Sequence, residues 1–409
     1  MLYYFGFPEI WLRRDDAKKK GKDRMRVAAA VFAACFAAVS AMAETVVDVK
    51  GAGAEKIRVS VDVKGDSAFA NSLKRNLDLA GCFVIARDGA VKVTGAVGST
   101  IVAEGRGKAL SLPSSAKDAK AARMEARMLA DKMTETFGRQ KGFACDKIAF
   151  VSKKGRDVSE LCTCYPDGYD ILQLTSDGMT TVGPRWRGRD SIFFTGIRNA
   201  GPQVFEYNAA TGRLSLKWSF KGLATGAAFS PDGRKAAIIL SIHGNPELYV
   251  IDVAAGSWSR LTTTPFASEG QPCWSPDGKR IAYVSDESRK PQIYVIDVAT
   301  KKKTLVTMAG SQNVDPDWGL DNRIVYVSRR SGGNQVAIVD MNGADRKPTL
   351  VGEPGSWEHP SWSRDGRHVV AGRDKALFVV DTLPPEKGGD APKRLFRNEG
   401  NWITPCWSK

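Results

Sequence analysis

Six polar side chains stand three to five residues ahead of a tryptophan, at spacings that repeat along this 409-residue chain. Carboxylates beside a histidine supply groups for proton transfer or metal coordination. On loops, the same residue types also contact partner proteins, or accept hydrogen bonds from backbone N–H groups where strands begin. The six residues are Glu269, Gln271, Asn313, Asp315, Glu358 and His359.

Catalysis and metal binding find little support elsewhere in the sequence. The chain has only 3 histidines, and the other two, His243 and His368, belong to different repeats. No motif pairs a nucleophile with an oriented base, and the G-x-S-x-G elbow of many hydrolases is missing from the sequence. We therefore predict no enzymatic activity, no catalytic residues, no cofactor and no metal site.

The tryptophans themselves belong to a repeat of about 44 residues. Aromatic anchors recur at intervals of 43 to 45 residues, at Trp186, Phe229, Trp274, Trp318, Trp362 and Trp407. Most middle anchors lead into a turn such as Ser275-Pro-Asp-Gly278. Proline presets the second position of that turn, aspartate caps it, and glycine takes the position that needs a positive φ.

Each repeat contains enough β-prone segments for four strands. The turn leads into a strand such as Arg280–Val284, and the next strand ends in an acid, as in Ile293–Asp297. Four antiparallel strands in about 44 residues are typical of a propeller blade. The second-strand motif occurs six times, beginning at Lys147–Val151, whereas Ile403–Ser408 is a first strand with nothing after it. We expect a mainly β fold with a six-bladed β-propeller over residues 143–409, closed by its C-terminal strand.

Residues 44–142 have a different pattern. Apolar residues alternate between Ile57 and Val63, as in a strand, and Phe69–Leu79 has the spacing of one helix face. A long helix is expected from Lys117 to Phe137, with Met124, Met128 and Met133 on its apolar side. This segment is predicted to be a small mixed α/β domain.

The first residues have the pattern of an export signal. Val27 to Val39 is a short apolar run after Arg26, and Ala41-Met-Ala43 matches a cleavage site. We assign 25–43 to a signal peptide and 1–24 to an upstream extension, with a longer n-region as the alternative for 1–24. The expected mature chain starts at Glu44. Residues 44–54 are then a mobile N-terminal segment, either a frayed end or a strand that adds to a partner's sheet.

The net charge and the cysteines bear on possible partners and on disulfide bonds. The net charge is +15, but its basic residues are spread, which favours a solvated basic surface over nucleic-acid binding. Six cysteines follow the leader, and their pairing is left open: Cys82, Cys145, Cys162, Cys164, Cys273 and Cys406. Because Cys162 and Cys164 are two residues apart on a predicted strand, they share a face and indicate packing or a local bridge.

Leader, small α/β domain and six SPDG-type blades together resemble the TolB family, the periplasmic component of the Tol-Pal cell-envelope system. The resemblance covers nearly the whole expected mature chain. Its most specific stretches are Phe69–Leu77, 141–152, Asp167-Gly-Tyr-Asp170, Ser311–Asp315 and Pro405–Ser408.

The resemblance implies a binding protein rather than an enzyme. In that family, the face bearing the loops before each innermost strand receives the peptidoglycan-associated lipoprotein, Pal. Carried over, the Pal-binding residues are the six named at the outset. The mature N-terminal segment of the family binds inner-membrane TolA, which here is Glu44, Thr45, Val46, Val47, Asp48 and Val49.

The family resemblance therefore implies a periplasmic, monomeric adaptor that links Pal to TolA and supports envelope integrity and outer-membrane constriction at cell division. It touches membranes only through its partners. Two alternatives remain from the sequence: a propeller that binds envelope glycans or peptides, and a hydrolase or lyase.

Overall fold

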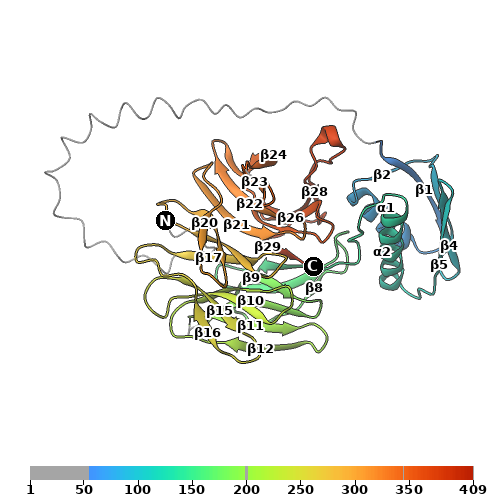
Figure 1. The fold of residues 1–409 in the computed structure, drawn as a ribbon. Helices are drawn as coiled ribbons and strands as arrows, with labels where there is room; N and C mark the ends of the chain where they lie inside the picture. Colours follow the sequence, from blue (N-terminus) through green and yellow to red (C-terminus); the bar gives the residue numbers. More distant parts are fainter. Residues whose placement is uncertain (1–54, 199–200, 344, 409) are drawn as a thin grey trace. The chain divides into compact units, whose positions relative to one another are not determined.

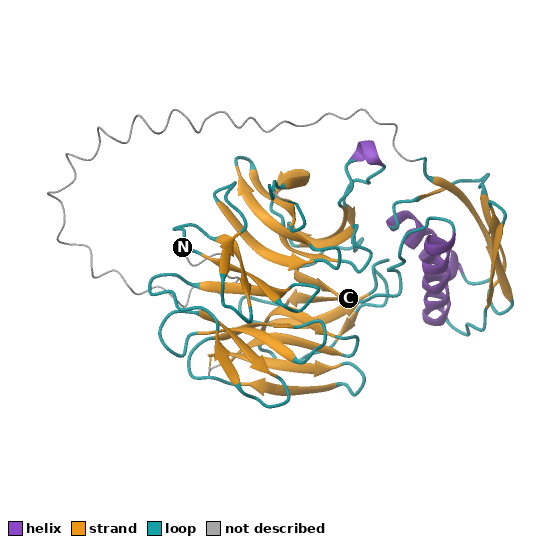
Figure 2. Cartoon of the chain, in the orientation of Figure 1, coloured by secondary structure: helices purple, strands orange, loops and turns teal. Residues whose placement is uncertain are grey.

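The computed structural model describes residues 55–198, 201–343 and 345–408. The predicted extension, signal peptide and N-terminal segment 44–54 lie outside these residues. Within them, no helix combines the length and the apolar character needed to cross a membrane. In the described part of the chain, helices are confined to the α/β part and one short turn near the C-terminus, η1 (Pro385–Lys387), as Figure 2 shows.

The α/β part is a five-stranded sheet in the order β2-β1-β3-β4-β5, with α1 and α2 packed together on one of its faces (Figure 1). Strand β1 runs parallel to both β2 and β3, and β3, β4 and β5 form an antiparallel meander. The strands are β1 (Ile57–Lys64), β2 (Phe83–Ile85), β3 (Val91–Ala96), β4 (Thr100–Gly105) and β5 (Lys108–Pro113).

Both helices begin at an aspartate cap. Asp66 accepts a hydrogen bond from the backbone N–H of Ala68 at the start of α1 (Ser67–Leu79), and Asp118 accepts one from Ala121 at the start of α2 (Ala119–Thr136). Each cap satisfies an N–H that the first helical turn leaves without an intrahelical partner. One prediction needs correction, because Met128 is 42% exposed and does not line the buried side of α2.

The rest of the described chain forms six four-stranded sheets, each running outward from an innermost strand. Blade 1 contains β29 (Trp402–Trp407), β6 (Ile148–Lys153), β7 (Ser159–Cys164) and β8 (Leu172–Gln173). Blade 2 contains β9 (Thr180–Arg187), β10 (Ser191–Arg198), β11 (Gly201–Asn208) and β12 (Arg213–Trp218). Blade 3 contains β13 (Ala224–Phe229), β14 (Lys235–Leu240), β15 (Glu247–Asp252) and β16 (Trp258–Arg260).

The remaining three blades repeat this arrangement. Blade 4 contains β17 (Glu269–Trp274), β18 (Arg280–Ser285), β19 (Gln292–Asp297) and β20 (Lys303–Leu305). Blade 5 contains β21 (Gln312–Trp318), β22 (Arg323–Arg330), β23 (Gly333–Asp340) and β24 (Thr349–Gly355). Blade 6 contains β25 (Glu358–Trp362), β26 (His368–Arg373), β27 (Ala376–Asp381) and β28 (Lys393–Arg394).

The predicted fold class is confirmed, including closure by the C-terminal strand. Strand β29 pairs antiparallel with β6, from Trp402 opposite Ser152 to Trp407 opposite Ile148. The innermost strands contact one another in the cyclic order β9, β13, β17, β21, β25, β29 and back to β9. The aromatic anchors also contact neighbouring blades. For example, the indole N–H of Trp274 in blade 4 donates a hydrogen bond to the carbonyl of Ala228 in blade 3 at 2.9 Å.

The turns after the anchors have the expected chemistry. In blade 3, the Asp232 carboxylate accepts hydrogen bonds from the Ser230 hydroxyl at 2.6 Å and from the backbone N–H of Arg234 at 3.0 Å. Gly233 then takes a φ of 67°, a conformation that costs other residues more than glycine.

Cys162 and Cys164 carry no disulfide. Both side chains are buried in one apolar cluster with Ile148, Phe150 and Trp407. Of the two possibilities left open by the sequence, the structure therefore supports packing.

A buried ion pair joins the α/β part to the propeller. Arg127 of α2 donates from Nε and Nη2 to the two carboxylate oxygens of Asp167, both at 2.9 Å, and its Nη1 lies 2.8 Å from Asp170. The guanidinium also covers the ring of Tyr165, 3.9 Å from its centroid. Ser72 of α1 donates a further hydrogen bond to Asp167 at 2.6 Å.

These contacts involve the ends of the blade strands opposite to the starts of the innermost strands. Asp167 and Asp170 lie between β7 and β8, and Arg367, which donates to Gln140 at 3.1 Å, lies in the turn between β25 and β26. The innermost strands of all six blades begin at the other end. We call that side, with the loops that enter the innermost strands, the entry face.

Replacing Arg127 by alanine should destabilise the protein by about 3–5 kcal/mol, because it leaves the Asp167 carboxylate buried without its cation. Urea unfolding followed by circular dichroism would measure the loss. As a control, Arg58→Ala removes an arginine of the same domain whose side chain is 53% exposed in its pair with Asp88, and it should change the midpoint little. Equal midpoints for the two variants would contradict the importance of the buried pair.

Candidate functional site

A ring of six equivalent residues surrounds the propeller axis at the entry face. They stand three residues before each anchor, and all have a positive φ between 48° and 71°. We call them the axial ring: Gly183, Gly226, Gln271, Asp315, His359 and Thr404. A β-bulge in each innermost strand accompanies this conformation, since the strand register shifts there in every blade.

The polar members of the axial ring link successive blades. The side-chain oxygen of Gln271 accepts a hydrogen bond from the backbone N–H of Asp315 at 2.9 Å, and Asp315 accepts one from the backbone N–H of His359 at 3.1 Å. A second row lies two residues further on, where Asp317 accepts from Trp362 at 2.7 Å and Ser361 accepts from Trp407 at 3.1 Å. Side chains of blades 4, 5 and 6 therefore satisfy backbone donors of the blade that follows.

Asp315 and His359 also form an ion pair, with Nδ1 of His359 3.0 Å from Oδ1 of Asp315. Burial alone would lower the pKa of His359, but the carboxylate of Asp315 outweighs it and the net pKa is raised. Burial would raise the pKa of Asp315, and the imidazolium of His359 reverses this so that the net pKa is lowered. Each group therefore favours the charged form of the other.

Glu269 occupies a different environment from the axial ring. Its side chain is 2% exposed and accepts hydrogen bonds from Thr264 at 3.0 and 2.9 Å and from Ser285 at 3.1 Å. Burial, followed by repulsion from nearby Glu247, raises the pKa of Glu269 to about 8. Thr264 also donates its backbone N–H to Glu247 at 2.6 Å. Through its hydrogen bonds with Thr264, buried Glu269 therefore holds the loop 262–268 in place.

Asn313 has the same role in the next blade. It is fully buried, and its amide donates to the carbonyl of Ala309 at 2.8 Å and to Gln292 at 2.6 Å. Gln292 in turn accepts from the hydroxyl of Thr307 at 2.9 Å. Gln292 and Asn313 thus hold the loop 306–312, as Glu247 and Glu269 hold the loop 262–268.

The structure therefore divides the six predicted site residues into two groups. Gln271, Asp315 and His359 are connected across three blades, and Glu358 lies half-buried beside His359 with a pKa raised by burial. Glu269 and Asn313 lie apart from them, behind the surface, and were expected on it only because their positions precede a strand. The predicted TolA segment, 44–49, falls outside the described residues.

Two exposed side chains of the entry face were missed by sequence reasoning. Phe266 is 99% exposed and Met308 is 82% exposed, the highest values for large apolar side chains in the described part of the chain. They sit on the loops that Glu269 and Asn313 fasten. Sequence offers no pattern for them, because a single apolar residue in a loop looks the same whether it turns inward or outward.

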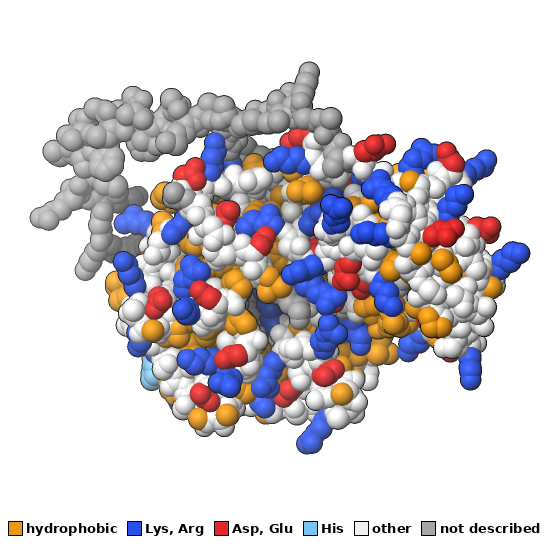
Figure 3. Space-filling view, turned by 45° about the vertical axis from the view of Figure 1, so that its right-hand side comes forward, with side chains coloured by type: hydrophobic (Ala, Val, Ile, Leu, Met, Phe, Trp, Pro, Cys, Tyr) orange, Lys and Arg blue, Asp and Glu red, His pale blue; other side chains and the backbone are white. Residues whose placement is uncertain are grey.

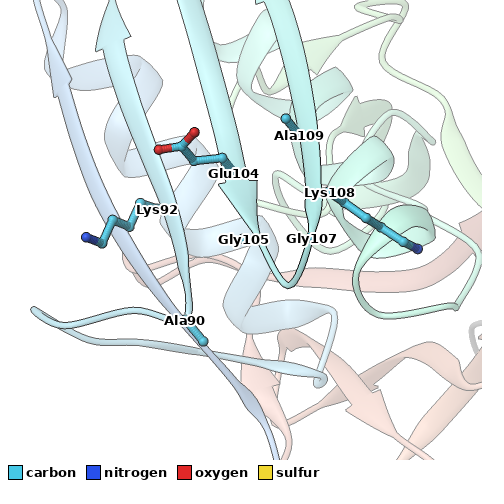
Figure 4. Close-up of a pocket in the computed structure, with 7 residues that line it drawn as sticks. All are labelled: Ala90, Lys92, Glu104, Gly105, Gly107, Lys108 and Ala109. Carbon is cyan, nitrogen blue, oxygen red and sulfur yellow. The ribbon is translucent and has the colours of Figure 1, made fainter.

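A concave region lies on the α/β sheet, and its polar side chains do not converge on a common point. It is lined by residues of β3, β4 and β5 and their connections: Ala90, Lys92, Glu104, Gly105, Gly107, Lys108 and Ala109. In Figure 4 the side chains of Lys92, Glu104 and Lys108 point in different directions. Among the residues that the structure describes, no three His, Cys, Asp or Glu side chains gather where they could hold a metal ion.

Lysine and arginine side chains are scattered over the surface in Figure 3, with acidic side chains among them and no single basic stripe on the face shown. This distribution agrees with a solvated basic surface.

Comparison with known proteins assigns the chain to a family. Residues 133–409 match the family model described as the TolB beta propeller domain. The chain belongs to the TolB family. This match spans all six blades that the structure describes.

Two individual TolB proteins are similar to part of this chain. The Tol-Pal system protein TolB of Gluconobacter oxydans is 27% identical over 143 residues, which is 34% of this chain and 32% of that protein. The protein of the same name from Rickettsia bellii is 29% identical over 128 residues, or 30% of this chain and 29% of the relative. The chain thus matches about a third of the length of these curated relatives.

A solved structure shows the same fold over nearly the whole chain. The crystal structure of TolB from Acinetobacter baumannii superposes with a TM-score of 0.76 at 21% identity, covering 88% of this chain and 98% of that one. The resemblance to TolB proteins therefore includes both the α/β part and the propeller.

Glu269→Gln should make stability less dependent on pH. A glutamate in an unfolded chain loses its proton near pH 4.5, whereas folded Glu269 keeps it up to about pH 8. Between these values the folded state binds one proton more than the unfolded state, so stability falls as pH rises. The variant should be more stable than the parent chain by about 1–3 kcal/mol at pH 8, with the difference shrinking toward pH 4.5.

Thermal unfolding of both chains from pH 4.5 to 8.5 measures this effect. Glu287→Gln is the matched control, since it removes a carboxyl group of the same blade whose pair with Lys303 lies at the surface, where an ion pair contributes little to stability. A Glu269→Gln profile parallel to that of the parent chain would show that the carboxyl group is ionised in the folded state.

Proposed function

We propose that this TolB-family chain is a periplasmic adaptor of the Tol-Pal system, linking the outer-membrane lipoprotein Pal to inner-membrane TolA. In this role it supports envelope integrity and outer-membrane constriction at cell division, and it has no enzymatic activity. The observation that carries the proposal is the family match over residues 133–409. It is supported by relatives named as Tol-Pal system proteins.

The entry face is the proposed binding surface for Pal. The contacts between the α/β part and the propeller, such as Arg127 with Asp167 and Arg367 with Gln140, involve the opposite strand ends. The entry face therefore stays available for a partner. Gln271, Asp315, Glu358 and His359 surround its centre, whereas Glu269 and Asn313 act from behind by shaping its loops.

The environment of the charged groups favours binding over catalysis. Asp315 and His359 favour each other's charged forms, and Asp315 accepts a hydrogen bond from the backbone N–H of His359 within the ring. A general base must reach a proton on its substrate, whereas these two side chains already contact each other. The geometry of this pair instead supports a preorganised, rigid surface.

TolA binding is assigned to Glu44–Val49, on the basis of the family resemblance and of a β-prone sequence that suits strand addition to a partner's sheet. These residues are separate in sequence from every element of the entry face. The two partners should therefore be lost independently when each region is altered.

Calorimetric titration of the purified chain with the soluble domain of the Pal-type lipoprotein from the same cell tests the first half of the proposal. One-to-one, saturable binding is expected, because the entry face has one axis and one central ring. An absence of heat and of any shift in sedimentation, with the chain shown to be folded, would contradict it.

Deleting residues 44–49 tests the second half. The deleted chain should lose binding to TolA and keep its affinity for Pal, since the propeller is untouched. A scrambled segment of the same composition serves as the control for length and charge. Equal loss of both partners from a folded deletion variant would argue against a separate TolA segment.

A further inference from the structure

Three loops of the entry face are tied into one patch. The backbone N–H of Ser268, at the end of the loop 262–268, donates to Asp286 at 2.8 Å. The backbone N–H of Asn313, at the end of the loop 306–312, donates to the carbonyl of Pro291 at 2.9 Å. The hairpin 286–291 therefore contacts the ends of both other loops, and the strands that these loops enter, β17 and β21, are adjacent (Figure 1). We call these three loops, with Phe266 and Met308, the blade 4–5 patch.

The loops of the patch are held rigidly beneath their exposed tips. Thr264, two residues before Phe266, bonds through its hydroxyl to Glu269 and through its N–H to Glu247. Its carbonyl also accepts a hydrogen bond from Asn245 at 3.0 Å. Ala309, directly after Met308, is held by Asn313. A loop fixed in this way loses little further entropy when a partner binds.

A single exposed apolar residue is ordinary on a protein surface. Here two stand on neighbouring loops, each supported by a separate set of buried polar side chains that fixes it outward. Phenylalanine offers a large rigid contact area, and methionine adapts its shape to the surface it meets. Aromatic residues and methionine are enriched at protein interfaces, where a few such side chains carry most of the binding energy.

The charges of the patch limit the kind of partner. Arg289 and Lys290, at the tip of the hairpin, are exposed, and no carboxylate among the residues that the structure describes lies within ion-pairing distance of them. The acids of the same hairpin are occupied, because Glu287 pairs with Lys303 at 2.6 Å and Asp286 accepts the N–H of Ser268. Asp286 keeps its negative charge at the base of the hairpin, but the charges at the exposed tip are the positive ones of Arg289 and Lys290.

We propose that the blade 4–5 patch is the anchor of the interface with the Pal-type lipoprotein, with Phe266 and Met308 entering apolar recesses of a partner whose rim is acidic. This inference rests on the proposed function and adds to it the side chains that carry the affinity. Asp315, in the axial ring, belongs to the same strand as the end of the Met308 loop, so the anchor is continuous with the ring.

Titration of the purified chain and its variants with the soluble Pal domain tests the proposal. Phe266→Ala should weaken binding about tenfold or more, and Met308→Ala about threefold or more, as expected for alanine replacements at hot spots. Leu320→Ala is the matched control: Leu320 is 52% exposed in the turn between β21 and β22, at the opposite strand ends, and its loss should leave affinity unchanged. All three variants should unfold at the temperature of the parent chain.

The charge of the rim is tested by association kinetics. The double variant Arg289→Glu, Lys290→Glu should slow association with Pal more than it speeds dissociation, and added salt should slow association of the parent chain. Faster association of the double variant would overturn the acidic rim.

The outcomes separate the anchor from the adaptor function. If the parent chain binds Pal and both alanine variants bind equally well, the anchor role is wrong and the adaptor proposal stands. If the parent chain does not bind Pal, the adaptor proposal fails and the patch loses its assigned partner. If the parent chain dimerises in sedimentation velocity and Phe266→Ala abolishes the dimer, the occupant is a second copy and the assignment to Pal is overturned.

Discussion

Closure of the ring by β29 and β6 is the interaction on which the rest of the propeller depends. Pairing of these two strands joins segments about 250 residues apart in the chain and completes blade 1. The indole of Trp186 in blade 2 then donates to the carbonyl of Cys406 in β29. Without this strand, the backbone partners of blades 2 and 6 would be missing, and β6 would present an unpaired edge. The axial ring exists only because the circle is complete.

The constraint of closure also explains why the polar residues of the entry face are arranged as they are. Bulges at the ring positions turn backbone N–H groups toward the preceding blade, where Gln271, Asp315, Asp317 and Ser361 accept them. The strain of a positive φ at residues such as His359 persists because these contacts hold the backbone in place. Residues whose types suggest catalysis therefore serve first to join the innermost strands of neighbouring blades. The rigid surface that results suits the binding of a partner.

Much of this architecture could be predicted from the sequence, because repeats constrain structure strongly. Six anchors at nearly constant intervals determine the number of blades, and the unpaired first strand at Ile403–Ser408 predicts which strand closes the ring. Apolar periodicity predicts the helices from Phe69 and from Lys117. The stretches Phe69–Leu77 and Asp167–Asp170, chosen as family-specific, are in contact through Ser72 and Asp167.

The sequence does not predict which way a side chain points or how deeply it is buried. Periodicity gives no reason to bury Arg127, and the position of Glu269 before a strand does not reveal that it faces inward. Phe266 faces outward because Glu247 and Asn245 hold the backbone of its loop through hydrogen bonds to Thr264. Only the fold brings these two residues close to the loop.

The backbone N–H groups of the axial ring donate in one direction around the axis. Each accepting side chain belongs to the earlier blade and each backbone donor to the blade that follows, as in Gln271 with Asp315 and Asp315 with His359. A 44-residue unit copied within the gene would therefore carry with it the acceptor for whichever blade comes next, and would find its own acceptor already present in the blade before. Duplication needs no matching change in the neighbours, which is a simple route by which one ancestral blade multiplies into a closed circle.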